Sequence, residues 1–103
     1  MEKLVQRKDN TLVVRIPVEV DHCFADAVRE EVDRRLQTEE INVLEFDFEE
    51  TEFMDSSGIG LLMGRYKLMK ALGGKVCITN ASERIRKILM LSGIHKIIPM
   101  EEF

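Results

Sequence analysis

Short runs of alternating apolar and polar residues predict five strands along this chain, separated by segments with helical spacing. Lys8, Asp9 and Asn10 have the composition of a tight turn, so the first two strands are expected to pair as an antiparallel hairpin. Pro17 ends the second strand, and Pro99 places the last strand at a sheet edge. The predicted strands cover residues 3–7, 11–16, 42–48, 75–79 and 96–100.

Three helices are predicted from apolar residues that recur three and four positions apart. The first follows Asp21, its expected N-cap, and the second begins near Ser56 and ends near Ala71. The third follows a capping-box sequence that begins at Asn80, and this helix is expected to end at Ser92-Gly93. The expected apolar faces are Phe24, Ala27, Val28, Val32 and Leu36 in the first helix, Ile59, Leu62, Met63, Tyr66 and Met69 in the second, and Ile85, Ile88 and Leu89 in the third.

The strand at residues 42–48 indicates how the layers are arranged. Its apolar residues Leu44 and Phe46 alternate with Glu45 and Asp47, so one face of the strand carries carboxylates. A central strand covered by helices on both sides would be apolar on both faces, so we expect the helices mainly on one face of the sheet. With right-handed crossovers, the order ββαβαβαβ predicts a two-layer α/β fold with a mixed β-sheet, as one domain over residues 1–103.

Composition narrows the class of protein. The 103 residues are 45% hydrophobic and 33% charged, with a formal net charge of −4, as in a globular protein whose main partner is not nucleic acid. We expect no membrane span and no signal peptide, and therefore a cytoplasmic location. Cys23 and Cys77 form no CxxC motif, and His22 and His95 are isolated, so we expect free thiols, no metal site and no cofactor.

The segment Phe53–Leu62 carries the candidate chemistry. An apolar lead-in is followed by Asp55, Ser56 and Ser57, two glycines, and the second helix. Both serines are therefore expected at the positive end of the helix dipole, where a phosphate would be held by free N–H groups. Gly58 and Gly60 are expected to leave the approach to the serines open.

Two enzymatic interpretations of this segment find little support. A serine nucleophile needs an adjacent base, and the Gly-x-Ser-x-Gly pattern of hydrolases is absent. The dinucleotide-binding pattern lacks its third glycine, because position 63 is Met, and the P-loop ending Gly-Lys-Ser/Thr is missing as well. These residues therefore do not favour a hydrolase or a standing nucleotide site.

The charged residues around the serines allow more than one interpretation. Glu49, Glu50, Glu52 and Asp55 form either a solvated loop or an acidic rim that faces a basic partner. Arg65, two turns along the second helix, is either solvated or a partner contact. The Asp21 loop is expected beside the serine loop, because both lead from core segments into helices.

Residues 54–67, Met-Asp-Ser-Ser-Gly-Ile-Gly-Leu-Leu-Met-Gly-Arg-Tyr-Lys, resemble the phosphorylation-site segment of the anti-sigma-factor antagonists, which are single STAS domains. The similarity is closest to the stage II sporulation AA type. Val20-Asp21-His22, the stop at Gly73-Gly74 and residues 91–98 resemble further segments of that family. The resemblance extends from the first hairpin to about Pro99.

This resemblance implies a regulatory protein that is the substrate and ligand of a kinase and is not itself an enzyme. In its unphosphorylated form the protein would bind an anti-sigma factor with serine protein kinase activity and so release the sigma factor. The kinase would then phosphorylate the serine directly after the aspartate, Ser56, with Ser57 as the alternative, and a metal-dependent serine phosphatase would reverse the modification. The expected partner contacts are Asp21, Asp55, Ser56, Ser57, Gly58, Gly60 and Arg65.

Two positions depart from the family pattern. Val18 stands where the family commonly has glycine, and the chain ends at Phe103, where relatives continue into a final helix. We expect a monomer, with a weak dimer as the alternative. The other functions considered are a constitutive STAS scaffold or nucleotide-sensing module, in which Ser56 only caps the helix, and a small hydrolase. Motif similarity favours sporulation over a stress pathway and does not identify the sigma factor.

Overall fold

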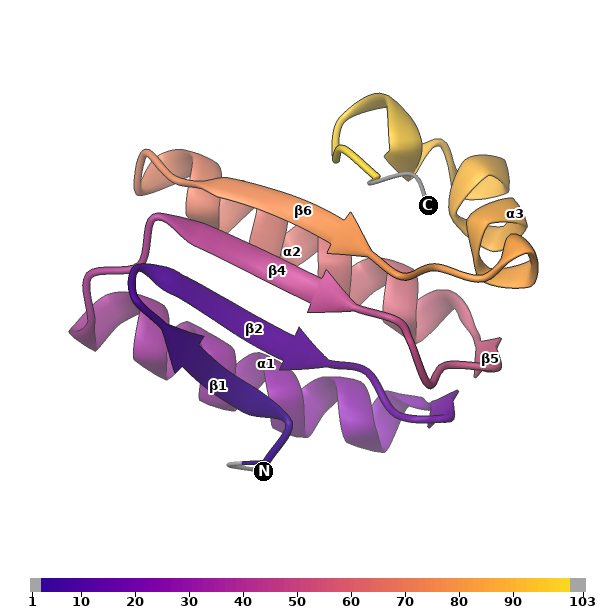
Figure 1. Cartoon of the computed structure of the whole chain (residues 1–103), viewed down its shortest axis with the longest axis horizontal. Coiled ribbons are helices and arrows are strands. Elements are labelled where there is room, and N and C mark those ends of the chain that lie inside the picture. Colours follow the sequence, from indigo (N-terminus) through magenta and orange to yellow (C-terminus); the bar gives the residue numbers. More distant parts are fainter. Residues whose placement is uncertain (1–2, 101–103) are drawn as a thin grey trace.

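The computed structural model describes residues 3–100 and has the layers of a mixed α/β fold (Figure 1). The strands are β1 (Val5–Lys8), β2 (Thr11–Arg15), β3 (Glu19–Val20), β4 (Val43–Asp47), β5 (Phe53–Met54) and β6 (Lys75–Thr79). The helices are α1 (His22–Thr38), α2 (Ser56–Ala71) and α3 (Glu83–Ser92), followed by the short 3-10 helix η1 (Ile94–Lys96).

The main sheet has the strand order β1-β2-β4-β6, in which β1 is antiparallel to β2 and the other neighbours are parallel. Asp9 adopts a left-handed conformation (φ 54°) in the turn between β1 and β2, which matches the twist of a tight hairpin. The predicted hairpin and mixed sheet are therefore confirmed. Buried side chains line up across the parallel strands in two rows, Leu12–Leu44–Val76 and Val14–Phe46–Ile78.

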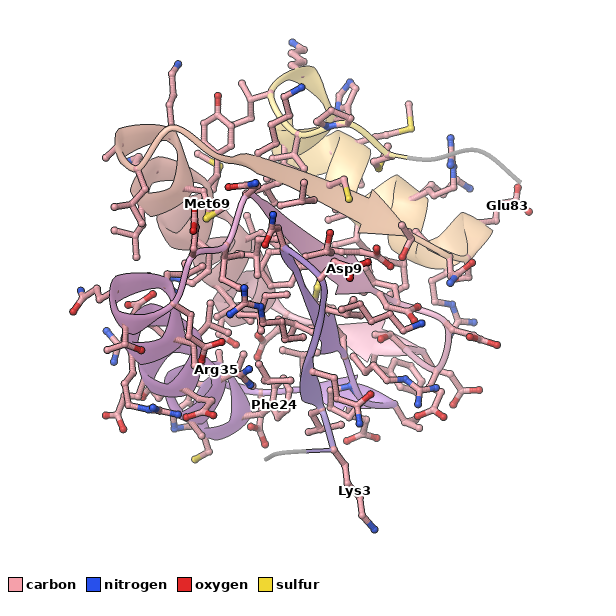
Figure 2. The ribbon with its side chains drawn as sticks, turned by 60° about the vertical axis from the view of Figure 1, so that its left-hand side comes forward. Lys3, Asp9, Phe24, Arg35, Met69 and Glu83 are labelled. Atoms are coloured by element: carbon pink, nitrogen blue, oxygen red, sulfur yellow. The ribbon has the colours of Figure 1, made fainter. Side chains whose placement is uncertain are left out.

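Both long helices lie against the same face of this sheet, as the alternation in β4 predicts (Figure 1). Arg35 of α1 reaches β1, where its Nη1 donates a hydrogen bond to the Val5 carbonyl at 3.1 Å (Figure 2). The other face of the sheet carries the partly exposed side chains of Val13, Glu45 and Asp47. The two-layer arrangement follows from burying only the apolar side of each strand.

Two short strands appear where the pattern predicts only the segments leading into α1 and α2. β3 pairs in parallel with β5, with Glu19 opposite Phe53 and Val20 opposite Met54. Strands of two residues are too short to show alternation, so periodicity does not reveal them. This small second sheet lies just before the two helix starts and sets how they are placed.

The strand predicted at residues 96–100 is wrong over most of its length. Residues 94–96 form η1, and only Met100 makes a bridge, in parallel, to Ile78 of β6. Ile94 and Ile98 are both buried, and the amides of Ile97 and Ile98 donate to the Ile94 carbonyl at 3.1 Å and 2.9 Å. The segment therefore satisfies its backbone hydrogen bonds locally, as a helical turn does, and pairs with β6 only at its end.

The start of α3 also differs from the prediction. Ser82, not Asn80, caps the helix, and its Oγ accepts a hydrogen bond from the Ile85 amide at 3.2 Å. Asn80 has φ 57°, which is not the extended conformation of an N-cap, and its side-chain amide donates to Asp47 at 3.0 Å. Its role is to tie the end of β6 to the end of β4. The predicted stop at Gly93 is confirmed, with φ 82°.

The buried faces of the long helices are partly displaced from the predicted ones. In α1, Ala25 is buried in place of Ala27, which is exposed. In α2, Leu61 and Arg65 are buried, whereas Ile59, Met63 and Tyr66 are only partly buried. Since α2 packs on both the sheet and α1, its buried stripe is turned toward α1 relative to the stripe that spacing alone predicts.

Candidate functional site

The serine segment forms the first turn of α2, as predicted. Asp55, which follows β5 and has an extended backbone, is the N-cap of α2. Its Oδ1 accepts a hydrogen bond from the Ser57 amide at 2.8 Å. The same carboxylate oxygen accepts a second bond from the Ser57 hydroxyl. Helix α2 begins at Ser56, so the backbone N–H groups of its first turn point toward this end of the molecule.

The two helix starts lie side by side because of the β3–β5 pairing. Val20 opposite Met54 brings the next residues, Asp21 and Asp55, to neighbouring strand ends. Asp21 caps α1 by accepting a hydrogen bond from the Phe24 amide at 2.9 Å. The expected proximity of the Asp21 loop and the serine loop is thus confirmed, and the two capping carboxylates share one edge of the molecule.

The electrostatics of this edge favour an ionised Asp55. The hydrogen bond from the Ser57 side chain, with that from the Ser57 amide, lowers the pKa of Asp55 below its ordinary value of 3.8. The nearby His22, the first residue of α1, adds a smaller effect in the same direction. Asp55 therefore carries its negative charge throughout the neutral range.

Ser56 and Ser57 differ in their surroundings. Ser56 is exposed, and its hydroxyl makes no hydrogen bond within residues 3–100. Ser57 is partly buried, and its hydroxyl is engaged by Asp55. Ser57 also lines a hollow of about 380 Å³ between α1 and α2, together with Arg29, Arg65 and neighbouring residues. Neither hydroxyl is hydrogen-bonded to a histidine in the described part of the chain.

The two glycines of the segment have different roles, and only one matches the expectation. Gly60 is exposed, and a Cβ there would meet nothing within 4 Å, so it does leave the surface open. Gly58 is buried, and a Cβ there would collide with the side chain of Met54 and contact Val20. Gly58 therefore allows α2 to pack closely on the β3–β5 pair and does not form part of the approach to the serines.

Arg65 is buried and not solvated: it is only 7% exposed and lies between α1 and α2, where it lines the same hollow as Ser57. Its contact with a partner stays a prediction. Its Nε lies 2.7 Å from Oδ1 of Asp33 on α1, an ion pair whose atoms are not aligned as a hydrogen bond. Burial lowers the pKa of Arg65, and the carboxylate of Asp33 opposes that shift. Asp33 and Arg65 are far apart in the sequence, so the pattern of residues does not predict this ion pair.

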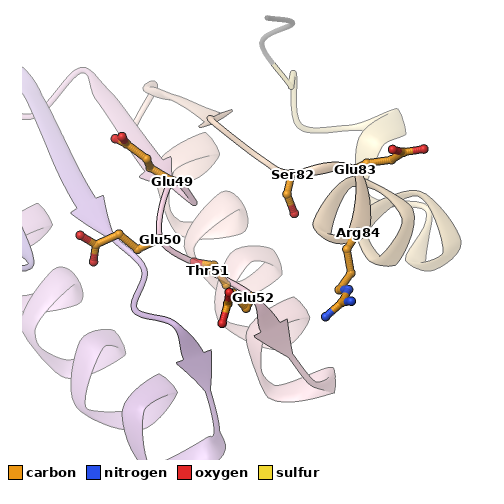
Figure 3. Close-up of a pocket in the computed structure, with 7 residues that line it drawn as sticks. All are labelled: Glu49, Glu50, Thr51, Glu52, Ser82, Glu83 and Arg84. Atoms are coloured by element: carbon orange, nitrogen blue, oxygen red, sulfur yellow. The ribbon is translucent and has the colours of Figure 1, made fainter.

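The acidic segment before β5 borders a hollow that it shares with the start of α3. Glu49, Glu50, Thr51 and Glu52 line one wall of this hollow of about 450 Å³, the start of α3 forms the opposite wall, and Ser56 and Ser57 do not line it (Figure 3). Asp55, the last member of the acidic run, is the one that sits at the serine cap. Pattern analysis gave Phe53 no role beyond an apolar lead-in to the serines. Its side chain is 53% exposed and lies under the guanidinium of Arg84.

Two negative findings concern the described residues alone. None of the helices in residues 3–100 has the length and apolar character to cross a membrane. Over the same residues, no group of three or more His, Cys, Asp or Glu side chains is arranged to hold a metal ion.

Comparison with known proteins agrees with this geometry. The STAS domain family matches residues 2–102. An anti-sigma F factor antagonist of Paenibacillus polymyxa is 35% identical over 89 residues, covering 86% of this chain and 76% of the relative. An anti-sigma-B factor antagonist of Bacillus subtilis (strain 168) is 30% identical over 95 residues, covering 91% and 84% of the two chains.

Solved structures show the same fold. The anti-sigma factor antagonist SpoIIAA in its unphosphorylated form superposes with a TM-score of 0.85 at 27% identity, covering 95% of this chain and 86% of that one. The phosphorylated form of the Bacillus cell fate determinant SpoIIAA superposes with a TM-score of 0.77 at 27% identity, covering 95% and 89%. The chain therefore belongs to the STAS domain family and is similar within it to the SpoIIAA-type anti-sigma-factor antagonists.

Proposed function

We propose that this protein is an anti-sigma-factor antagonist that is switched off by phosphorylation of Ser56. Without phosphate it binds an anti-sigma factor that is also a serine protein kinase, and this binding releases the sigma factor. The kinase transfers a phosphoryl group from ATP to the Ser56 hydroxyl, and a metal-dependent serine phosphatase removes it. A protein with this function acts in the cytoplasm, where transcription takes place.

The observation that carries this proposal is the free hydroxyl of Ser56 at the first position of α2. Ser56 is exposed, and its hydroxyl has no hydrogen-bond partner in the described residues, while Asp55 provides the N-cap. A serine retained only to cap the helix would accept a hydrogen bond from the first turn, and Asp55 already does so. Ser56 is thus available to an incoming kinase at no cost to the helix.

The surroundings favour Ser56 over Ser57 as the acceptor. A phosphate on Ser57 would replace the hydroxyl that donates to Asp55 and would set a second anion against that carboxylate. A phosphate on Ser56 leaves the contacts between Asp55 and Ser57 in place. Its charge faces the N–H groups of the first turn, which stabilise an anion.

The same charge is unfavourable at an interface. A phosphoserine adds about −1.5 to −2 charges at neutral pH. Asp21 and Asp55 already place two carboxylates at this edge of the molecule. A partner surface that fits this edge is therefore complementary to these two negative charges. An additional dianion in a desolvated contact is expected to weaken binding by about a hundredfold or more.

The test is intact-mass analysis of the wild type, Ser56→Ala and Ser57→Ala after incubation with the cognate anti-sigma kinase and ATP. We expect one added phosphate on the wild type and on Ser57→Ala, and none on Ser56→Ala. Binding of each unmodified variant to the kinase, measured by calorimetry, controls for misfolding. Phosphate lost only in Ser57→Ala moves the site by one residue, and binding without any phosphorylation refutes the switch.

A further inference from the structure

A second surface, separate from the serine cap, combines charges of both signs with exposed apolar side chains. Two hollows meet at the start of α3: one is lined by the acidic segment 49–52, the other by Lys87, Ile88 and Leu91. Glu83 and Arg84 line both hollows and so lie between them. We call the set Glu52, Phe53, Arg84, Lys87 and Leu91 the α3 surface.

The charges on the α3 surface do not neutralise one another within the molecule. Over residues 3–100, Glu52, Arg84 and Lys87 take part in no ion pair. Arg84 instead lies 5.4 Å from the centre of the Phe53 ring. Figure 3 shows Glu49 and Glu50 directed away from α3, while Arg84 extends from the start of α3. The surface therefore has an acidic strip, in which Glu52 lines the hollow, and a basic strip of Arg84 and Lys87, beside which the carboxylate of Glu83 also lies.

Apolar side chains accompany the charges. Leu91 is 88% exposed and Phe53 is 53% exposed, which is unusual for residues of this size. Arg84, Lys87 and Leu91 are spaced so that they follow one face of α3. The surface thus offers an apolar contact area bordered by an acidic and a basic strip, which is the composition of an interaction surface.

We propose that the α3 surface binds a second copy of this chain, as a two-fold symmetric dimer. A partner of a single charge sign would attract one strip and be repelled by the other. A two-fold axis near Phe53 and Arg84 instead sets the acidic strip of each copy against the basic strip of the other, so that Glu52 of one faces Lys87 of its partner. Phe53 and Leu91 are then covered by the same contact.

This proposal goes beyond the phosphorylation switch and is independent of it. Ser56 and Asp55 are not part of the α3 surface, and self-association is measured without kinase or ATP. A failure of one proposal therefore leaves the other untouched.

The first experiment is sedimentation equilibrium of the full chain over a concentration series at low and high salt. The expected result is a reversible monomer–dimer equilibrium whose dissociation constant rises with salt, because charge pairs at a partly exposed interface are screened. A wild-type chain that stays monomeric at every concentration overturns the proposal.

The second experiment is a reciprocal charge reversal. Glu52→Lys and Lys87→Glu should each raise the dissociation constant about tenfold or more, because each places like charges opposite one another. Mixing the two variants should restore dimerisation, since the mixed dimer again sets opposite charges against each other at both contacts. Glu30→Lys on α1 and Lys67→Glu on α2 are exposed controls with the same changes in net charge. Equal weakening by these controls, or no recovery on mixing, overturns the proposal.

Discussion

At the scale of single residues, Gly58 and Gly60 show how one motif serves two purposes. Both lie in the first turns of α2, and both lack a side chain, but only Gly58 is enclosed by other residues. The side chains of Met54 and Val20 lie so close to Gly58 that only a hydrogen atom fits at this position of the helix. Gly58 is therefore required for packing, whereas Gly60 occupies an exposed position of the helix.

Alanine substitution should separate these two roles. Gly60→Ala should stabilise the fold by about 0.5–1 kcal/mol, because alanine favours an exposed helical position with free space around it. Gly58→Ala should destabilise it by about 1–3 kcal/mol, because Met54 must move to admit the new methyl group. Urea unfolding followed by circular dichroism measures both. Equal effects of the two substitutions would contradict the packing role of Gly58.

At the scale of elements, α1 and α2 are joined by the ion pair of Asp33 and Arg65, near which the charged side chain of Arg29 also lies. Arg65 replaces one of the hydrophobic residues expected on the buried stripe of α2, and Asp33 of α1 supplies its counter-charge. The side chain of Asp33 is 31% exposed, so the pair retains part of its hydration. Such a pair orients the two helices with respect to each other as well as holding them together.

A double-mutant cycle with Arg65→Met and Asp33→Asn should give a coupling energy of about 1–3 kcal/mol, as for partly buried pairs in contact. The matched control is the exposed pair of Glu31 and Arg34, with an N–O distance of 2.8 Å, for which about 0.5 kcal/mol or less is expected. Unfolding free energies of the single and double variants supply the cycle. Similar coupling in both pairs would show that burial of Arg65 adds nothing.

At the scale of the whole molecule, the two parallel strands β3 and β5 bring both helix starts to one edge. This edge combines two N-terminal helix ends with the capping carboxylates of Asp21 and Asp55. In the proposed switch, a phosphate on Ser56 would meet the helix end inside the domain and would change the surface that a partner meets. The proposed switch therefore requires no change of fold.

A negative charge placed at the start of one helix and at the end of another should test this argument. Ser56→Asp, at the start of α2, should leave the unfolding free energy unchanged or slightly higher, because the helix dipole favours a negative charge there. Thr38→Asp, at the last residue of α1, should lower it by about 0.3–1 kcal/mol. Thermal unfolding of the full chain compares them. A large loss of stability in Ser56→Asp alone would mean that the switch acts by disrupting the fold.

Features that depend on neighbouring residues could be predicted from the pattern of the chain. The alternation in β4, the start of α2 at Ser56 and the stop at Gly93 each arise from contacts within a few residues. The same holds for the family, because the motif at residues 54–67 is a continuous segment. The predicted strand at residues 96–100 failed because this segment closes backbone hydrogen bonds locally, from Ile97 and Ile98 to Ile94, and bridges β6 only at Met100.

The order of the main-sheet strands and the three helices from β1 to α3, the single apolar face of the sheet and the membership of the STAS family could be predicted from the amino-acid sequence, because each is expressed by residues close together in the chain. The short strands β3 and β5 could not. Tertiary structure alone decided which serine has a free hydroxyl, which glycine is enclosed, and that Arg65 meets Asp33. These outcomes depend on side chains that come together only when α1, α2 and the β3–β5 pair pack, and no local spacing records that packing.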